Sequence, residues 1–350
     1  MGRLRRDATV PAGLPRGLNA PLAQASAGSC QDCVIGTKGR HSVRVPVARS
    51  RAGLAALSAG LLIAGGIAAG LSIHGTGTPG SPASAATLRL TTTPKPTASA
   101  GHRAHADPLG TTAASYLSAR TGTVLAAVYD LRTGQTWSLG AGPPQAEASV
   151  VKLDVLETLL AERGGGSAGL AASDRSLAEQ MIEDSDNGAA TSLWYEVGGP
   201  DKIRAFNAAA GLTQTSPSSC VACPGFAWPG WGLTTTVPAD QIALLRLLVE
   251  PGPLLTAADR SYALSLMENV TPSQRWGVSG GVPAGVTVAL KNGWLPLDSS
   301  DTNWQINSVG WISGRGRDYL MAVLTTANPT EQYGISTIDG LAALVWRGMS

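Results

Sequence analysis

Hydrophobic and polar positions divide the chain into a leading part without a core pattern and a later part that has one. Residues 52–73, AGLAALSAGLLIAGGIAAGLSI, carry no charged side chain, and this length lets a helix cross the roughly 30 Å hydrocarbon layer of a bilayer. Residues 74–108 are rich in Ser, Thr, Pro, Gly and Ala, a composition typical of an extended linker. We therefore predict a basic disordered segment at 1–51, a membrane helix or signal anchor at 52–73, a linker at 74–108 and a folded domain at 109–350.

The apolar run at residues 146–165, AEASVVKLDVLETLLAERGG, predicts a helix with two reactive side chains at its start. Ser149 and Lys152 are three positions apart, so they share one face of a helix. Ser149 could be a plain N-cap, which accepts a hydrogen bond from an orphan N–H of the first turn. It could also be a nucleophile with Lys152 as its base, at a helix start whose N–H groups favour developing negative charge.

Two further polar motifs lie in the folded part. Residues 177–199 place Ser185-Asp186-Asn187 between two amphipathic helical stretches, where Ser or Asp could simply cap the next helix. Residues 286–297, VTVALKNGWLPL, indicate a β-branched strand ending in Lys291-Asn292-Gly293, which could be an ordinary Asn-Gly turn. Each motif taken alone has this structural explanation.

Charge is distributed unevenly along the chain. The net charge is +2, but residues 107–350 hold 14 basic and 22 acidic side chains, a charge of −8. Such a domain is a poor nucleic-acid binder, so we exclude nucleic acid as a partner. Basic residues before position 52 place the N-terminus in the cytoplasm by the positive-inside rule. The domain is then extracytoplasmic and held at the cell membrane, or secreted if the chain is cleaved near Ala83-Ser84-Ala85.

The distribution of histidine and lysine restricts the chemistry. All four histidines, His41, His74, His102 and His105, precede the folded domain. This excludes a Ser-His-Asp triad, a Cys-His dyad and most catalytic zinc sites. A nucleophile in the domain would need a carboxylate or one of three lysines, Lys152, Lys202 and Lys291. We expect no metal and no organic cofactor.

The four cysteines form two C-x-x-C pairs. Cys30 and Cys33 lie in the basic segment without further metal ligands nearby, so we interpret them as incidental thiols. Cys220 and Cys223 lie on the predicted outer side, where a disulfide persists. We expect a structural clip there rather than a redox site, because no thioredoxin-like βαβ pattern surrounds the pair.

Together, S-x-x-K, S-D-N and K-x-G in this order resemble the signature of serine β-lactamases and penicillin-binding proteins. The chain is similar to the class A β-lactamase-like family over nearly all of residues 110–348. The resemblance implies an α/β fold of the α+β type, with a five-stranded antiparallel sheet flanked by helices plus an all-α subdomain. It implies an opening hairpin at 123–140 and a Thr-rich turn with its helix at 231–249. Two later strands are implied at 304–326 and a closing helix at 334–349.

The resemblance also implies a serine hydrolase that is acylated at Ser149 by a β-lactam or a related amide or peptide. Lys152 would accept the Ser149 proton as a neutral amine, its pKa lowered by burial and by Lys291. Ser185, held by Lys291, would relay the proton to the leaving nitrogen. The substrate-binding groups implied are Asn187, Asn292, Gly293 and Trp294, with the N–H groups of Ser149 and Trp294 as the oxyanion hole.

Three departures from the family pattern bear on turnover. Residues 202–239 contain no Asp or Glu, whereas the family carries a glutamate there that activates the deacylating water; Asp201 and Asp240 only flank the gap. Asn292 replaces the usual threonine. The interval from Ser149 to Ser185 is 36 residues, shorter than the family usually has. A more open cleft would suit a peptidoglycan peptide, and its candidate lining residues are Trp228, Trp231, Trp276 and Trp294, unless they pack in the core.

Several functions stay open at this point. Hydrolysis of β-lactams competes with D-Ala-D-Ala carboxypeptidase or esterase activity, which the missing glutamate favours. A penicillin-binding sensor without turnover is a further hypothesis, and a purely structural envelope protein is another. Fold alone does not decide among them.

Overall fold

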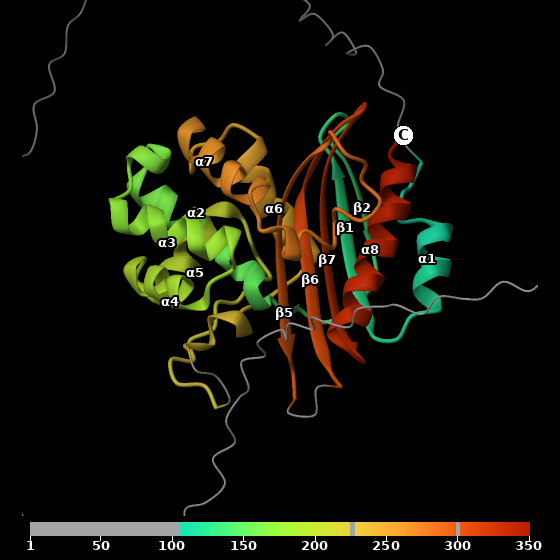
Figure 1. Cartoon of the computed structure of the whole chain (residues 1–350), viewed down its shortest axis with the longest axis horizontal. Helices are drawn as coiled ribbons and strands as arrows, with labels where there is room; N and C mark the ends of the chain where they lie inside the picture. The colour runs from blue at the N-terminus through green and yellow to red at the C-terminus, as the bar shows by residue number, and fades with distance from the viewer. Residues whose placement is uncertain (1–105, 225–227, 299–301) are drawn as a thin grey trace, which may run out of the picture. The chain divides into compact units, whose positions relative to one another are not determined.

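The computed structural model describes residues 106–224, 228–298 and 302–350. Its centre is a five-stranded antiparallel sheet in the order β2-β1-β7-β6-β5 (Figure 1). The five strands are β1 (Thr123–Asp130), β2 (Gln135–Leu139), β5 (Thr287–Pro296), β6 (Trp304–Gly314) and β7 (Arg317–Asn328). This confirms the predicted sheet, including the opening hairpin and the two later strands.

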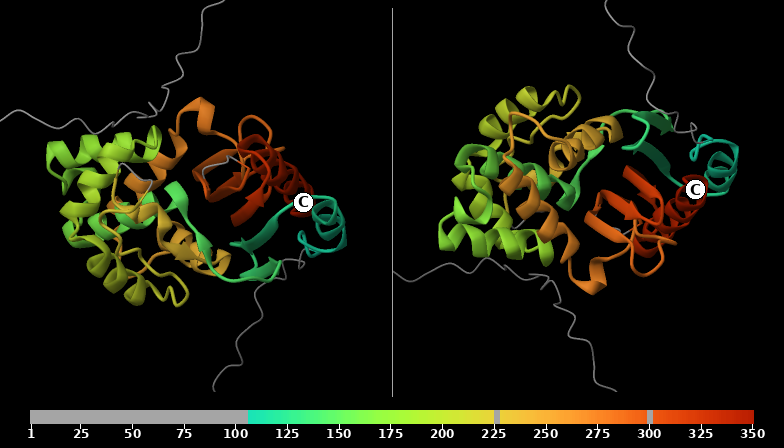
Figure 2. Two further views of the ribbon diagram at one scale, coloured as in Figure 1. Left: turned by 90° about the horizontal axis from the view of Figure 1, so that it is seen from below. Right: turned by 90° about the horizontal axis from the view of Figure 1, so that it is seen from above.

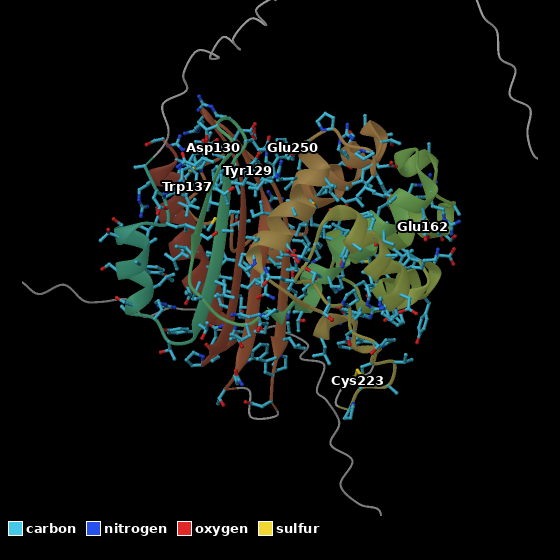
Figure 3. All side chains as sticks on the ribbon, turned by 180° about the vertical axis from the view of Figure 1, so that it is seen from behind. Tyr129, Asp130, Trp137, Glu162, Cys223 and Glu250 are labelled. Atoms are coloured by element: carbon cyan, nitrogen blue, oxygen red, sulfur yellow. A yellow bond between two sulfur atoms is a disulfide. The ribbon has the colours of Figure 1, made fainter. Side chains whose placement is uncertain are left out.

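Helices cover both faces of the sheet. On one face α8 (Glu331–Gly348) packs against β6 and β7, and α1 (Thr111–Ser118) packs on α8 (Figure 2). On the other face α6 (Pro238–Val249) contacts β1 and β7, and α7 (Ala257–Glu268) contacts β5. Tyr129 Oη donates to Glu250 Oε1 at 3.1 Å, which ties β1 to the end of α6 (Figure 3). The central residues of β1, β5, β6 and β7 are buried in continuous runs, and because successive side chains point to opposite faces, they form two hydrophobic cores, one on each face.

An all-α lobe lies beside the second face, as expected. It contains α2 (Val151–Arg163), α3 (Ala172–Glu183), α4 (Asn187–Glu196) and α5 (Gly199–Ala210). Every residue of α2 from position 151 to 160 is buried, so α2 is the central helix of the lobe. A helix buried all round is normally apolar, yet α2 buries Lys152, Asp154 and Glu157.

The three motifs have the local structure that positions their side chains. Ser149 lies in a short 3₁₀ helix, η1 (Ala148–Val150), and α2 begins at Val151 without a side-chain cap. The N-cap alternative for Ser149 is therefore wrong. Asp186 Oδ1 accepts from the Ala189 N–H at 2.7 Å and caps α4. The strand does not end at Asn292-Gly293, because both residues pair with β6 and β5 continues to Pro296.

The leading segments cannot be compared with the fold. The predicted segments 1–51 and 52–73, residues 74–105 of the linker, and Cys30 and Cys33 lie outside the described residues. Within the ranges that the structure describes, no helix combines the length and the apolar character needed to cross a membrane.

Candidate active site

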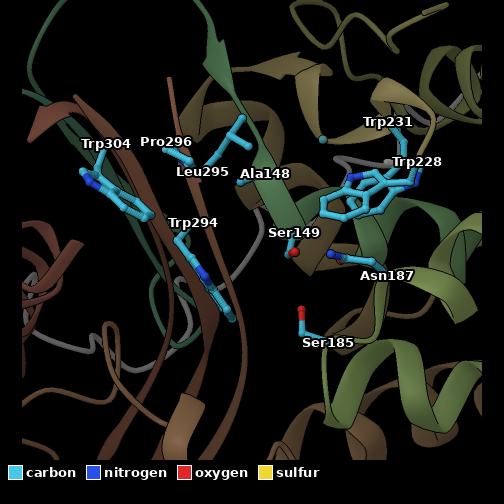
Figure 4. Close-up of a pocket in the computed structure, with 11 residues that line it drawn as sticks. Ala148, Ser149, Ser185, Asn187, Trp228, Trp231, Trp294, Leu295, Pro296 and Trp304 are labelled. Carbon is cyan, nitrogen blue, oxygen red and sulfur yellow. The ribbon is translucent and has the colours of Figure 1, made fainter. Parts of the chain in front are cut away.

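Ser149 lies on a turn that neighbouring strands hold in place. The turn follows β3 (Gln145–Ala146), which pairs with β4 (Thr235–Thr236). Asn307 Nδ2 donates to the Ala146 and Glu147 carbonyls at 2.8 and 2.9 Å, and Glu147 N–H donates to Thr234 O at 2.7 Å. Ala148 has a φ of 52°, a left-handed conformation that costs a non-glycine residue roughly 1–2 kcal/mol. The turn is therefore fixed by its surroundings, with the Ser149 hydroxyl directed into a cavity (Figure 4).

Two buried amines converge on the hydroxyl of Ser185. Lys152 Nζ lies 3.0 Å from Ser185 Oγ, and Lys291 Nζ lies 2.9 Å from the same oxygen. Lys152 also donates to Ser185 O at 2.6 Å and to Asn187 Oδ1 at 2.8 Å. Among the described residues no hydrogen bond joins Lys152 to Ser149. The structure thus brings the predicted Lys152, Ser185 and Lys291 into one network beside Ser149.

The loop between α3 and α4 presents the second motif to this network. Ser185 has a φ of 57°, and strained backbone of this kind persists only where the surroundings enforce it. Lys152 does so by donating to the Ser185 carbonyl. Asn187 accepts from Lys152 through Oδ1, so its amide nitrogen points toward Ser149 (Figure 4). Asn187 is therefore placed to contact both the base and a ligand.

Burial changes the proton affinity of both lysines. Lys152 and Lys291 are each 0% exposed. Burial, together with the charge of Lys291, lowers the pKa of Lys152 to about 6, although Asp186 partly opposes this. Burial lowers the pKa of Lys291 to about 7. Because desolvation disfavours the ammonium form, Lys152 is mainly a neutral amine at pH 7 and can accept a proton.

Strand β5 passes unusually close to the turn that carries Ser149. A methyl group placed on Gly293 would lie 2.7 Å from Glu147 O, 2.7 Å from Ser149 N and 2.9 Å from Val150 N. Only glycine permits this approach. The next residue, Trp294, lines the cavity with its side chain. The glycine of the third motif thus sets the distance between β5 and the nucleophile.

The structure places Asn292 away from the cavity. Its side chain is 1% exposed, and Nδ2 donates to Gln274 O at 2.7 Å and to Trp276 O at 2.9 Å. The Asn292 amide therefore holds residues 274–276 against β5. The expected substrate-binding role of Asn292 is not supported by this arrangement.

The cavity has a volume of about 220 Å³ and aromatic walls. Four tryptophans line it: Trp228, Trp231, Trp294 and Trp304. Trp276, the other candidate lining residue, follows its core-packing alternative: it packs edge-on against Trp294 with 6.1 Å between ring centroids and is not among the described lining residues. Trp304 was not anticipated, because only the pairing of β6 with β5 places it there.

A disulfide closes the loop that carries one aromatic wall. Cys220 and Cys223 are bonded to each other, and the Gly230 N–H donates to Cys220 O at 2.8 Å. Gly230 lies between Trp228 and Trp231, so the bridge supports both rings. Cys223 lies at the opposite end of the domain from Tyr129 and Glu250 (Figure 3).

Carboxylates lie behind the site rather than on its wall. Glu147, Asp154 and Glu157 are each 0% exposed, and within the described ranges the carboxylate oxygens of Glu147 and Glu157 have no hydrogen-bond partner. Burial raises the pKa of all three groups, that of Asp154 to about 7. Sequence reasoning missed them because periodicity cannot tell a buried acid from an exposed one.

Neither acid that flanks the loop reaches the cavity. Asp201 is 89% exposed and pairs with Arg204. Asp240 Oδ2 accepts from the Gln214 N–H and from Thr215 Oγ1. Among the residues that the structure describes, no Asp, Glu, Lys or Arg lines the cavity.

The sequence matches a known family. The profile of the beta-lactamase enzyme family matches residues 163–349, which include the second and third motifs and begin after Ser149 and Lys152. Proteins named "Putative lipoprotein LppW" from Mycobacterium tuberculosis and Mycobacterium bovis are 30% identical over 207 residues. That match covers 57% of this chain and 62% of the relatives, less than two thirds of their length.

Solved structures share the fold. The TLA-1 extended-spectrum β-lactamase aligns with a TM-score of 0.59 and 18% identity, over 68% of this chain and 96% of that one. A class A β-lactamase from Bacteroides cellulosilyticus aligns with a TM-score of 0.57 and 18% identity, over 69% of this chain and 96% of that one. An ancestral class A β-lactamase aligns with a TM-score of 0.55 and 22% identity, over 67% of this chain and 98% of that one. At these identities the similarity establishes the fold alone.

Proposed function

Because the chain belongs to the beta-lactamase enzyme family, we propose that Ser149 is the nucleophile of a hydrolase that forms an acyl-enzyme with a β-lactam, amide or peptide. The family and the fold support a serine hydrolase of the β-lactamase type. The observation that carries the proposal is the Ser185 hydroxyl held between two buried amines beside Ser149. Burying two amines lowers their pKa because the ammonium form is costly to desolvate, and a structural serine would not need such a pair.

The proposed reaction gives each group of the network a defined role. Ser149 Oγ attacks the carbonyl carbon, and its proton passes to the neutral Lys152 amine. Lys152 returns this proton through Ser185 Oγ to the leaving nitrogen as the C–N bond breaks. Lys291 holds Ser185 in place, and Asn187 orients Lys152 and the substrate amide. The N–H groups of Ser149 and Trp294 stabilise the oxyanion, and water then hydrolyses the ester.

Deacylation is the weaker half of this proposal. Residues 202–239 contain no Asp or Glu, and the cavity wall in the described ranges carries no carboxylate. Because a general base contributes typically 10²–10⁴-fold to such a step, water attack on the ester would be slow. The second candidate function is therefore a D,D-peptidase, an esterase or a penicillin-binding sensor, and slow deacylation favours these over a fast β-lactamase.

An intact-mass time course with benzylpenicillin tests the proposal on the full-length protein. We expect an adduct that Ser149→Ala abolishes and that persists in the wild-type protein. An adduct that clears while penicilloate accumulates would indicate a true β-lactamase with a deacylating group outside the cavity wall. No covalent adduct with penicillin or with any ester substrate would contradict acylation at Ser149.

Membrane attachment stays part of the proposal. The mycobacterial relatives carry the word lipoprotein in their name, and residues 52–73 form an uncharged apolar run. We propose that this segment holds the domain at the outer face of the membrane. Washing membranes with carbonate would release the protein if the segment were cleaved or did not insert.

A further inference from the structure

The two walls of the cavity present paired indole rings to the space around Ser149. Trp228 and Trp231 stack with 6.1 Å between centroids and an interplanar angle of 20°. Trp294 and Trp304 lie across from them, and Ser149 lies between the two walls (Figure 4). Any group attached to a carbonyl at Ser149 therefore contacts aromatic surface.

Two of these rings, Trp231 and Trp294, are held by contacts with the protein before a ligand arrives. Trp231 is 3% exposed, and its Nε1 donates to Thr191 Oγ1 at 3.2 Å. Lys152 Nζ lies 5.1 Å from the centre of the Trp231 ring. Trp294 is braced by the edge contact with Trp276. A preorganised wall loses little side-chain freedom on binding, which favours affinity.

The described part of these walls carries no charged side chain. The polar side chains that line the cavity are the neutral Ser149, Ser185 and Asn187. Lys152 and Lys291 are buried behind them, and both already donate to Ser185. Asn292, the third-motif residue, donates to backbone carbonyls instead. A carboxylate placed between the indoles would lose its hydration without gaining a cation, which is unfavourable.

We propose that this cavity is an acyl-group subsite for an uncharged hydrophobic ring, so the favoured substrate is an amide or ester whose acyl part carries such a ring. The inference rests on the proposed acylation of Ser149. It adds that selectivity comes from apolar burial against indole faces and that this subsite disfavours a carboxylate on the acyl group.

Acyl thioesters of N-acetylcysteamine test the selectivity on the full-length protein, since their leaving group is small and neutral. Ser149 Oγ forms the acyl C–O bond as the C–S bond breaks, the thiol leaves with the proton, and water releases the acid. We compare acetyl, phenylacetyl and succinyl thioesters by thiol release. The phenylacetyl thioester should have kcat/KM at least about tenfold above the acetyl one, with the anionic succinyl thioester lowest.

Two variants on the same strand make the test specific. Trp304→Leu removes a cavity ring, and the phenylacetyl-to-acetyl ratio of kcat/KM should fall about tenfold. Trp311→Leu is the matched control, because Trp311 is also a half-buried residue of β6 but donates to Asp318 away from the cavity. Its ratio should equal that of the wild type. If Trp304→Leu does not fold, Trp294→Leu replaces it. The phenylacetyl-to-acetyl ratio of the wild-type protein tests the proposal without either variant.

A binding measurement separates this inference from the proposed function. Tryptophan fluorescence is titrated with unreactive phenylacetamide and with the phenylacetate anion, and the amide should bind at least about tenfold more tightly. Ser149-dependent hydrolysis with no ring preference, or tighter binding of the anion, would overturn the subsite and leave the acylation proposal intact. Selective amide binding without any thioester hydrolysis would overturn acylation while supporting a ring-binding cavity.

Discussion

Lys152 shows how the surroundings of one residue decide its chemistry. A lysine on an exposed helix is a cation, whereas Lys152 is buried beside a second buried lysine, and its pKa falls to about 6. Lys202 on α5 offers the contrast, because it is 62% exposed and pairs with Glu162 at 3.3 Å. Both residues are lysines in the sequence, and only their different burial in the fold gives them different chemistry.

Replacing Lys152 should abolish fast acylation. Lys152→Met keeps an unbranched apolar stem but removes the proton acceptor, so the acylation rate by benzylpenicillin should fall by about 10²–10⁴-fold. Intact-mass kinetics at pH 7.5 measure this rate. Lys202→Met is the control and should acylate at the wild-type rate. Unchanged acylation in the Lys152 variant would exclude it as the base.

The acylation rate should also depend on pH. Lys152 accepts a proton only when neutral, so the second-order rate constant should rise between about pH 5 and 7 with an apparent pKa near 6. Lys291, with a pKa of about 7, contributes to the same profile, and the apparent values belong to the pair. A rate constant that stays flat over this range would contradict the assignment.

Only the residues of the candidate site that belong to the three sequence motifs could be predicted. Ser149, Lys152, Ser185 and Lys291 were selected by motif order and by elimination of histidine, and the structure brings them together. The substrate-binding role of Asn292 stays a prediction, and no local pattern indicates that its amide donates to the carbonyls of Gln274 and Trp276. Trp304 and the buried Glu147 had no local signal, since both depend on partners far away in sequence.

At the scale of elements, the approach of β5 to η1 is the tightest constraint on the site. The strand carries Lys291 and Trp294, and Gly293 between them allows contact with the backbone of residues 147–150. The sequence predicts a helix beginning near Ser149 and a strand over residues 286–297, but no pattern in either segment indicates how closely they approach. Such distances arise from packing of the whole lobe against the sheet.

A side chain at Gly293 should separate these elements. Gly293→Ala places a methyl group within 3 Å of three backbone atoms, so it should cost about 1–3 kcal/mol of unfolding free energy and reduce acylation by about 10²-fold or more, because a misplacement near 1 Å is enough for that. Urea unfolding and adduct kinetics measure the two effects. In Gly252→Ala the added methyl group meets no atom of the described residues within 4 Å, so acylation should be unchanged. A Gly293→Ala variant that acylates at the wild-type rate would refute the constraint.

At the scale of the whole molecule, the buried acids of α2 and its leading turn couple stability to pH. Folding raises the pKa of Glu147, Asp154 and Glu157, mainly through burial. The folded state therefore binds more protons than the unfolded state above about pH 4, and stability falls as the pH rises through the folded values. Asp154 reaches about 7, so the loss extends to neutral pH.

A neutral substitution should remove part of this dependence. Glu157→Gln keeps the shape but cannot ionise, so it should raise the unfolding free energy at pH 8 by on the order of 1–3 kcal/mol with little change at pH 5. Urea titrations at both pH values measure it. Glu162→Gln on the same helix is the control, since Glu162 makes an exposed ion pair. An equal change at both pH values would show that ionisation of Glu157 is not the cause.

The pairing of β1 with β7 also determines when the domain can fold. Thr123 at the start of β1 lies opposite Thr326 near the end of the chain, and a two-stranded hairpin such as β1–β2 is marginal alone. The sheet therefore cannot close until residues 317–328 have been synthesised. A chain that stops earlier leaves one edge of β1 unpaired, and an open edge of this kind is a template for aggregation.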